Sequence, residues 1–175
     1  MKTRKCKYCK AQFQPYTTLQ KNCFEPDCVT AWIQETKEKN WKRKKAKLKM
    51  DLMTIQDYIK LAQQVFNKYI RLRDKGQNCI SCGKPALKEN AGHFYNANNH
   101  WNVRFNELNV HLQCEHCNTY LSGNLINYRE NLLKKIGIED FELLSSEANK
   151  TRKFTVNELK EIIAVYKRKI KEIEK

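Results

Sequence analysis

The chain has 175 residues, 41% hydrophobic and 30% charged, which is enough for one compact domain with an appendage or for two small units. Its 34 Lys and Arg against 19 Asp and Glu give a net charge of +15, which predicts a polyanionic partner, with nucleic acid the first choice and a membrane surface the second. No apolar run is long enough to span a bilayer and no signal peptide is visible, so we expect a cytoplasmic protein without a membrane partner.

Eight cysteines form four close pairs along the sequence: Cys6/Cys9, Cys23/Cys28, Cys79/Cys82 and Cys114/Cys117. A disulfide framework is the alternative interpretation, but a reducing compartment disfavours it, and Cys-x-x-Cys pairs taken in twos suit tetrahedral zinc. We therefore predict two structural Zn²⁺ ions, each held by four thiolates.

Residues 1–30 are interpreted as a four-cysteine zinc finger, with Phe13, Tyr16 and Leu19 as a minimal core. Residues 31–53 follow as a basic helix or linker, in which eight Lys or Arg and one Glu lie between positions 37 and 49. A solvated helix usually mixes charge signs, so this imbalance favours a phosphate-binding arm. The DNA contacts predicted here are Lys42, Arg43, Lys44 and Lys45.

Three helical regions follow. Thr54 is a predicted N-cap for a helix that runs to about Lys75, and a second region spans about 125–136 and 138–148, interrupted by Gly137. The capping box Thr155-Val156-Asn157-Glu158 begins a last helix. The helices at 55–75 and 156–174 are candidate dimer surfaces. We expect an α+β, predominantly helical fold.

Residues 79–124 have little helical periodicity and are rich in His, Asn and Cys, so chemistry is expected there. Thirty-one residues separate Cys82 from Cys114, and two cysteine turns at that distance can clamp one zinc and hold the intervening segment as a hairpin. This segment contains His93, Asn109 and His111, and Asn118 directly follows the last cysteine. Taken singly, each has a plainer interpretation: a structural histidine for His93, a turn residue for Asn109 and a helix cap for Asn118.

The order His, Asn, Cys-x-x-Cys, Asn resembles HNH nucleases with a zinc-ribbon insertion. This resemblance implies a zinc-stabilised ββα-metal core over residues 54–137, followed by C-terminal helices at 138–175. It makes His93 the general base, Asn109 its orienting residue and Asn118 a ligand of catalytic Mg²⁺ or Mn²⁺. A neutral imidazole is a suitable base near pH 7, and a cation held by few protein oxygens keeps positions open for phosphate and water.

One position departs from the HNH pattern. These enzymes usually carry Asp, a second metal ligand, just before the catalytic His, and here that position is Gly92. The second ligand is therefore open among His111, Glu107 and Glu115, with His111 preferred; the alternative is a single protein ligand assisted by DNA oxygens.

Most of the chain also resembles the NinG family of lambdoid phages, also called Rap. The motifs that carry this resemblance are Lys5-Cys6-Lys7-Tyr8-Cys9, the 69–74 run Tyr-Ile-Arg-Leu-Arg-Asp, Ala91-Gly92-His93-Phe94, Arg104-Phe105-Asn106, the 109–114 run Asn-Val-His-Leu-Gln-Cys and Ser122-Gly123-Asn124. It implies an endonuclease that nicks Holliday junctions and D-loops through phosphate contacts, with little sequence readout. Further contacts are expected from Arg71, Arg73 and Arg104, and two symmetric nicks imply a homodimer.

Two other functions fit part of these observations. A non-catalytic DNA-binding protein with two zinc modules would explain the charge and the cysteines. A sequence-specific HNH homing or restriction enzyme would explain the His and Asn pattern, although no separate recognition domain is apparent.

Overall fold

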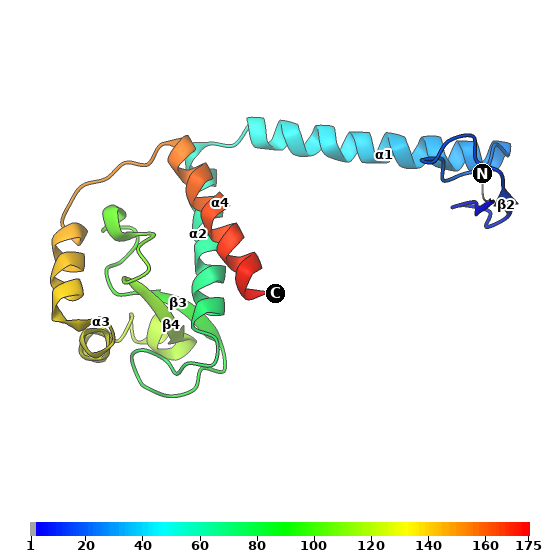
Figure 1. Ribbon diagram of the computed structural model, residues 1–175. Helices are drawn as coiled ribbons and strands as arrows, with labels where there is room; N and C mark the ends of the chain where they lie inside the picture. Colours follow the sequence, from blue (N-terminus) through cyan, green and yellow to red (C-terminus); the bar gives the residue numbers. More distant parts are fainter. Residues whose placement is uncertain (1–2) are drawn as a thin grey trace. The chain divides into compact units, whose positions relative to one another are not determined.

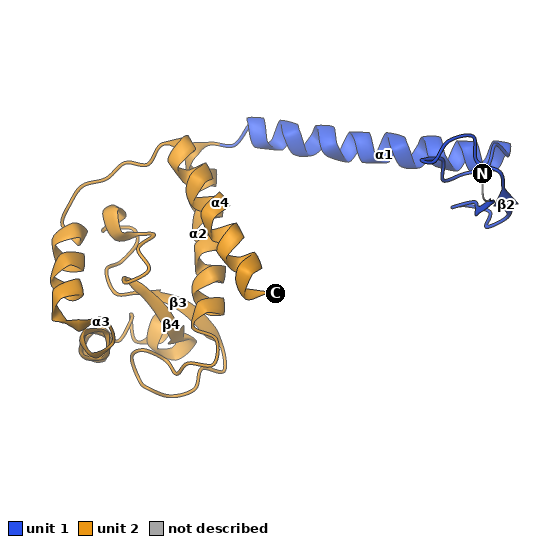
Figure 2. Cartoon of the chain, viewed as in Figure 1, with its two compact units in different colours: residues 1–53 blue, residues 54–175 orange. Residues whose placement is uncertain are grey.

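The computed structural model of the chain describes residues 3–175, so the first two residues of the predicted finger lie outside the described part. The chain divides into two compact units, residues 1–53 and residues 54–175 (Figure 2). Helices dominate and two small two-stranded sheets complete the structure, which confirms the predominantly helical α+β class. Within residues 3–175, no helix has both the length and the apolar content needed to cross a membrane.

The first unit is a short hairpin followed by one long helix. Strand β1 (Arg4–Lys5) pairs antiparallel with β2 (Gln12–Phe13), and helix α1 (Pro26–Asp51) follows, with proline in its first turn. Cys28 is the buried residue of α1, and every residue from Lys37 to Leu52 is exposed. A helix with this much like charge and no apolar stripe is stable only in contact with water, as its composition predicts.

The core of this unit is smaller than the sequence predicts. Cys6, Cys23 and Cys28 form its buried centre, and Tyr8 and Phe13 pack against them. Tyr16 and Leu19, which we expected in the core, are 77% and 84% exposed, so that part of the prediction is wrong. The cysteines fill the interior and leave these side chains no space there.

The second unit contains two paired helices, α2 (Ile55–Arg73) and α4 (Val156–Ile173). Both begin at the predicted threonine caps, Thr54 and Thr155, and each cap is a complete capping box. The helices lie side by side (Figure 1), and their apolar faces share one core with Phe66, Ile70, Tyr166 and Ile170. Their apolar stripes are therefore buried within one chain, which removes the reason for expecting a dimer surface there.

A β-hairpin lies between two cores of this unit. Strands β3 (Glu89–His93) and β4 (Val110–Cys114) pair antiparallel, with Gly92 opposite His111 and His93 opposite Val110. Because side chains alternate along a strand, His93 and Val110 face the α2/α4 core, whereas His111 faces helix α3 (Leu125–Ala148).

Two short turns complete the unit, η1 (Trp101–Val103) and η2 (His116–Tyr120). Helix α3 is broken at Gly137, where φ is 82° and ψ is 169°, as the sequence predicts. Its apolar residues form the second core, which contains Val103, Tyr128, Leu132, Phe141, Leu144 and Ala148.

Candidate functional site

Four cysteines of the second unit converge at one end of the β-hairpin. Cys79 and Cys82 lie in a turn closed by Gly83, Cys114 is the last residue of β4, and Cys117 lies in η2. Their Sγ atoms all lie within 4.8 Å of one another, and Cys82 Sγ is 3.9 Å from Cys114 Sγ. Sulfurs at about 2.3 Å from a tetrahedral zinc would be about 3.8 Å apart, so this group fits zinc and does not fit disulfides.

The surrounding backbone favours the thiolate form of Cys79, whereas burial raises the pKa of Cys114 and of Cys117. Burial alone would raise the pKa of Cys79, but backbone N–H donors, including those of Cys82 and Cys114, outweigh burial and lower it to about 7. Cys117 N–H also points at Cys114 Sγ from 3.4 Å. With four sulfurs present, such a site has no open position for catalysis and could serve only as a structural clamp.

The first unit holds a second group of the same kind. Cys6, Cys9, Cys23 and Cys28 also have their Sγ atoms within 4.8 Å of one another, with 3.7 Å between the Sγ atoms of Cys9 and Cys23. Burial disfavours the Cys6 thiolate, but backbone N–H groups of Cys23 and Tyr8 lower the pKa of Cys6 to about 6. Both predicted four-cysteine groups are therefore assembled in the structure and could each hold a metal ion such as zinc.

His93 lies at the end of β3 and is half-buried. Its Nε2 atom is 3.1 Å from the carbonyl oxygen of Arg104. A carbonyl only accepts, so this contact favours the tautomer with the proton on Nε2 and the lone pair on Nδ1. Burial lowers the pKa of His93 to about 4, so the ring is neutral at pH 7.

Asn109 acts on the loop and not on the imidazole. It is fully buried; its Oδ1 accepts from Tyr95 N at 2.8 Å, and its Nδ2 donates to the carbonyls of Tyr95 at 3.0 Å and Val103 at 3.1 Å. These bonds tie the chain just after His93 to the start of β4. The predicted orienting role can therefore be exerted only through the backbone.

His111, the preferred second metal ligand, lies on the other face of the hairpin from His93. It is 3% exposed, its Nδ1 is 3.4 Å from Tyr128 Oη, and burial lowers its pKa to about 3. Its imidazole lies against Tyr128 of α3, on the face of the hairpin away from His93. This placement argues against His111 as a ligand and favours a structural role.

A buried oxygen that the sequence analysis missed lies beside Gly92. Gln113 is fully buried, and its Nε2 donates to Ser81 Oγ and Gly123 O, both at 2.6 Å. Its Oε1 is the buried side-chain oxygen or nitrogen of residues 3–175 that has no hydrogen-bond partner. A Cβ built on Gly92 would lie 2.1 Å from this oxygen. Gln113 thus fills the space that a side chain at position 92 would occupy, and the only sequence signal was a Gln on a buried strand.

Asn118 lies inside η2 and is half-buried. The N-cap of η2 is Glu115 and that of α3 is Asn124, so the alternative interpretation of Asn118 as a helix cap is wrong. Beyond the two cysteine groups, no three His, Cys, Asp or Glu within residues 3–175 converge as a metal site. Glu107 and Glu115, the other candidate ligands, instead pair with lysines, Lys169 and Lys88. A catalytic cation would therefore rely on the amide oxygen of Asn118 and on oxygens of its substrate.

The predicted DNA-binding residues divide into two groups. Lys42, Arg43, Lys44 and Lys45 are exposed on α1, free to approach a phosphate, and Arg71 is half-buried. Arg73 instead bonds both carboxylate oxygens of Asp74 and the carbonyls of Glu107 and Val110, so its guanidinium braces the interior.

Arg104 is similarly engaged inside the unit. Only 9% exposed, it donates to Gln63 Oε1 and Ala97 O and lies 4.9 Å from the ring of Trp101. Burial and these internal partners argue against phosphate contacts from Arg73 and Arg104.

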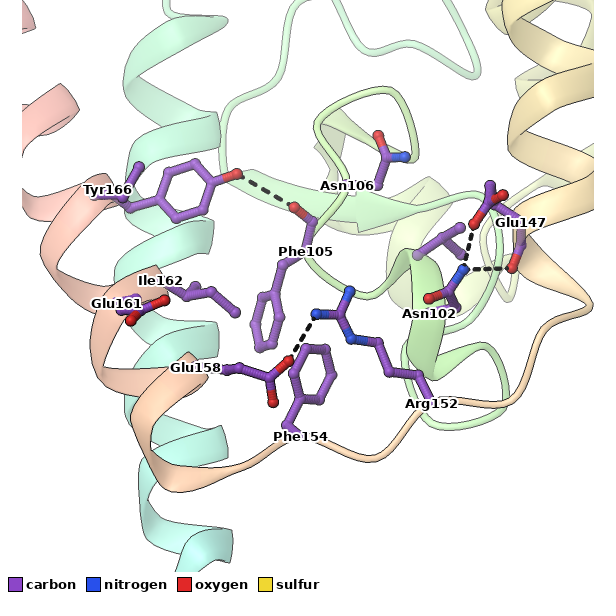
Figure 3. Close-up of a pocket in the computed structure, with 12 residues that line it drawn as sticks. Asn102, Phe105, Asn106, Glu147, Arg152, Phe154, Glu158, Glu161, Ile162 and Tyr166 are labelled. Atoms are coloured by element: carbon purple, nitrogen blue, oxygen red, sulfur yellow. Dashed lines mark hydrogen bonds and ion pairs between the residues drawn. The ribbon is translucent and has the colours of Figure 1, made fainter.

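The second unit also has an open cleft of about 630 Å³ between η1, the segment before α4, and α4 itself (Figure 3). Three glutamates line it against one arginine: Glu147 binds Asn102, and Glu158 pairs with Arg152. An acidic lining repels phosphate, so this cleft is not the candidate site for nucleic acid.

Comparisons with known proteins give one consistent result. A family model described as "Bacteriophage Lambda NinG protein" matches residues 1–175. The chain is similar to "Protein ninG" of Escherichia phage lambda (35% identity over 193 residues) and to proteins of the same name from Escherichia phage 933W (34% over 188) and Salmonella phage P22 (34% over 193). Each of these comparisons covers 97% of this chain and 93% of the relative. No solved structure matches. This chain belongs to the NinG family of lambdoid phage proteins.

Proposed function

We propose that the chain is a zinc-stabilised DNA endonuclease of the HNH type, which nicks branched recombination intermediates such as Holliday junctions and D-loops with Mg²⁺ or Mn²⁺. The observation that carries this proposal is the state of His93. Its ring is neutral, with the proton on Nε2 and the lone pair on Nδ1, at the end of a strand whose partner strand leads directly into a four-cysteine site. A general base for water needs a neutral nitrogen with a lone pair.

The residues around His93 have separate roles in the proposed hydrolysis. His93 Nδ1 takes the proton of the attacking water, and the Arg104 carbonyl keeps the ring in the required tautomer. Asn109 fixes the loop that follows His93. Asn118 Oδ1, in the half-buried turn after the last cysteine, is the amide oxygen we propose as the protein ligand. The bound cation supplies positive charge to the scissile phosphate.

Charge accounts for the substrate class. The lysines and arginines of α1 are exposed and carry little counter-charge, so they would bind the phosphates of any DNA with little sequence readout. A preference for branched DNA is implied by the family resemblance. Two symmetric nicks would require two active sites, so the proposal includes a twofold dimer on the junction.

A cleavage panel tests this proposal. Purified protein is incubated with a four-way junction, a D-loop and linear duplex, with and without Mg²⁺ or Mn²⁺. We expect metal-dependent nicks in the branched DNA, and His93→Ala should reduce the nicking rate about 10²–10⁴-fold while junction binding is unchanged. His116→Ala is the matched control, since His116 is an exposed histidine of η2 that has no part in the mechanism.

The panel also separates the two alternative functions. One observation favours a non-catalytic DNA-binding protein. Apart from the two cysteine groups, no cluster of three or more His, Cys, Asp or Glu side chains in residues 3–175 could hold a metal ion. Junction binding without nicking under any divalent metal would support that function and overturn ours. Cleavage of linear duplex at fixed sequences would instead support a homing or restriction enzyme.

A further inference from the structure

The first unit has a cleft of about 540 Å³ whose walls are unusually aromatic for such a small module. Tyr16, Phe24 and Trp32 line it and are 77%, 67% and 49% exposed. A module this small has little apolar surface to spare, so three large rings left in solvent are costly unless something covers them.

Two of the rings, those of Tyr16 and Phe24, lie in a loop that hydrogen bonds hold in place. Tyr16 N–H donates to Gln20 Oε1 at 2.8 Å, and Gln20 Nε2 donates to Asn22 O, also at 2.8 Å. The rings of Tyr16 and Phe24 meet edge to face with centroids 5.6 Å apart. Trp32 approaches from α1, one turn beyond the metal-group residue Cys28. A cleft fixed in this way loses little conformational entropy when it is filled.

Basic residues surround these rings. Lys7, Lys21 and Lys39 also line the cleft, where Glu35 is the acidic residue and pairs with Lys7 and Lys39. The whole unit, residues 1–53, contains fourteen Lys or Arg against five Asp or Glu. An apolar protein segment would gain nothing from this charge, whereas unpaired DNA presents flat rings and phosphates together.

We propose that this aromatic cleft binds unpaired nucleotides of DNA, with bases stacked on Tyr16, Phe24 and Trp32 and phosphates near the surrounding lysines. A D-loop carries a displaced single strand with unpaired bases, so the cleft would help to recognise that structure. The proposal rests on DNA as the partner in the proposed function, but not on catalysis in the second unit. Binding measured without Mg²⁺ or Mn²⁺ therefore tests it separately from nicking.

The test compares two labelled probes, a twelve-nucleotide oligo-dT and a blunt twelve-base-pair duplex, titrated with the full chain in buffer free of Mg²⁺ and Mn²⁺. Phe24→Ala and Trp32→Ala should each weaken oligo-dT binding about tenfold and change duplex binding less than twofold. Trp41→Ala is the matched control, because Trp41 is 61% exposed on the same helix but outside the cleft, and it should alter neither.

Two further measurements separate stacking from charge and from misfolding. Lys44→Ala should weaken both probes and reduce the salt slope of oligo-dT binding by about 0.7, whereas the ring variants should leave that slope unchanged. Bound zinc per chain should equal wild type in every variant, and Trp32→Tyr, which keeps a flat ring, should restore most of the binding.

Equal loss of both probes in zinc-replete Phe24→Ala and Trp32→Ala, or no loss of either, would overturn the proposal. Competition of an apolar acidic peptide for the cleft, with oligo-dT affinity unaffected by the ring variants, would assign the surface to a protein partner instead. A chain that binds oligo-dT through the rings but never nicks DNA would uphold this proposal and overturn the nuclease.

Discussion

The two four-cysteine groups have the same ligand chemistry and nearly the same sulfur spacing, yet their surroundings differ completely. In residues 1–53 the cysteines themselves are the buried centre, with two partly buried rings against them. In residues 54–175 the cysteines lie at the end of a hairpin that is already held between two apolar cores. Cysteine spacing thus predicts a metal group equally well in both units. It does not predict whether the metal would take the place of an apolar core or only add stability to a core that already exists.

Removing the metal should show the largest difference between the units. A structural zinc contributes about 10–16 kcal/mol in small zinc modules, and the first unit has no other core of comparable size. Cys6→Ser should therefore unfold residues 3–28 and make them sensitive to protease. Cys79→Ser should loosen the segment around residues 79–88 but leave α2 and α4 protected.

Limited proteolysis with mass spectrometry, on chains of measured zinc content, reads out both units at once. If metal-free residues 3–28 resist the protease as well as the wild type does, the first unit does not depend on a metal for its fold. The comparison between the units also fails if Cys79→Ser exposes α2 and α4.

The next largest effect should come from the internal ion pair of the second unit. Asp74 is 2% exposed and accepts from Arg73 Nε at 2.7 Å, Arg73 NH2 at 2.8 Å and Leu112 N at 2.9 Å. Asp74→Ala leaves a guanidinium without its partner and should lower the free energy of unfolding by about 3–5 kcal/mol. Asp140→Ala, at an exposed position of α3, should change it by less than about 0.5 kcal/mol. Urea unfolding followed by circular dichroism measures both, and similar losses would contradict the assigned role of Asp74.

The same carboxylate predicts a pH dependence confined to the second unit. Burial raises the pKa of Asp74, but the Arg73 guanidinium and the Leu112 N–H outweigh it and hold the pKa below its ordinary value. The stabilisation is therefore complete above the unfolded-state pKa of about 4 and is lost as pH falls through the lower folded-state pKa. The stability gap between wild type and Asp74→Asn should be constant from pH 5 to 7 and shrink below about pH 4. Metal loss in acid affects both chains alike, so a gap that widens in acid would refute this assignment.

A smaller effect should mark the hairpin face that bears Gln113. Gly92→Ala puts a methyl group 2.1 Å from Gln113 Oε1 and 2.9 Å from its Cβ, in a fully buried site that cannot easily yield. Overpacking of this kind costs about 1–3 kcal/mol. Gln113→Ala in the same chain should recover part of that loss, because the double variant removes the clash. Strictly additive losses in thermal or urea unfolding would show that the two side chains do not compete for the same space.

The smallest effect concerns a helix end. Thr155 Oγ1 accepts from Glu158 N at 3.3 Å, and the Glu158 carboxylate accepts from Thr155 N at 2.7 Å. Thr155→Ala should therefore cost about 1 kcal/mol in unfolding of the second unit. The first unit should be unaffected, so its protease pattern serves as the internal control. A changed cleavage pattern in residues 3–28 would show that the two units are coupled.

Local signals predicted much of the secondary structure. The threonine caps and the break at Gly137 depend on interactions within a few residues, and each was found where expected. The assembly of both cysteine groups was also predictable, because four thiols in two close pairs have few other favourable arrangements. These features needed no knowledge of which elements pack together.

Side-chain roles in the candidate site were less predictable. Arg73 and Arg104 were expected to bind phosphate but donate to internal carbonyls and side chains, and His111 faces α3 because it is one register position away from the strand face that His93 occupies. Which face a strand residue occupies depends on pairing with a distant strand. Whether the N–H donors of an arginine already have acceptors depends on carbonyls that the fold brings close to it. No pattern in the surrounding sequence encodes either.

The sequence alone thus determined the helices, the cysteine groups and the identity of the residues around His93, because short-range geometry and sulfur–metal chemistry are local. The tertiary structure decided that Gln113 fills the space above Gly92, that the Arg104 carbonyl selects the His93 tautomer, and that Tyr16, Phe24 and Trp32 face solvent. Each of these depends on which atoms share a small volume, and that is set by packing of segments far apart in the chain.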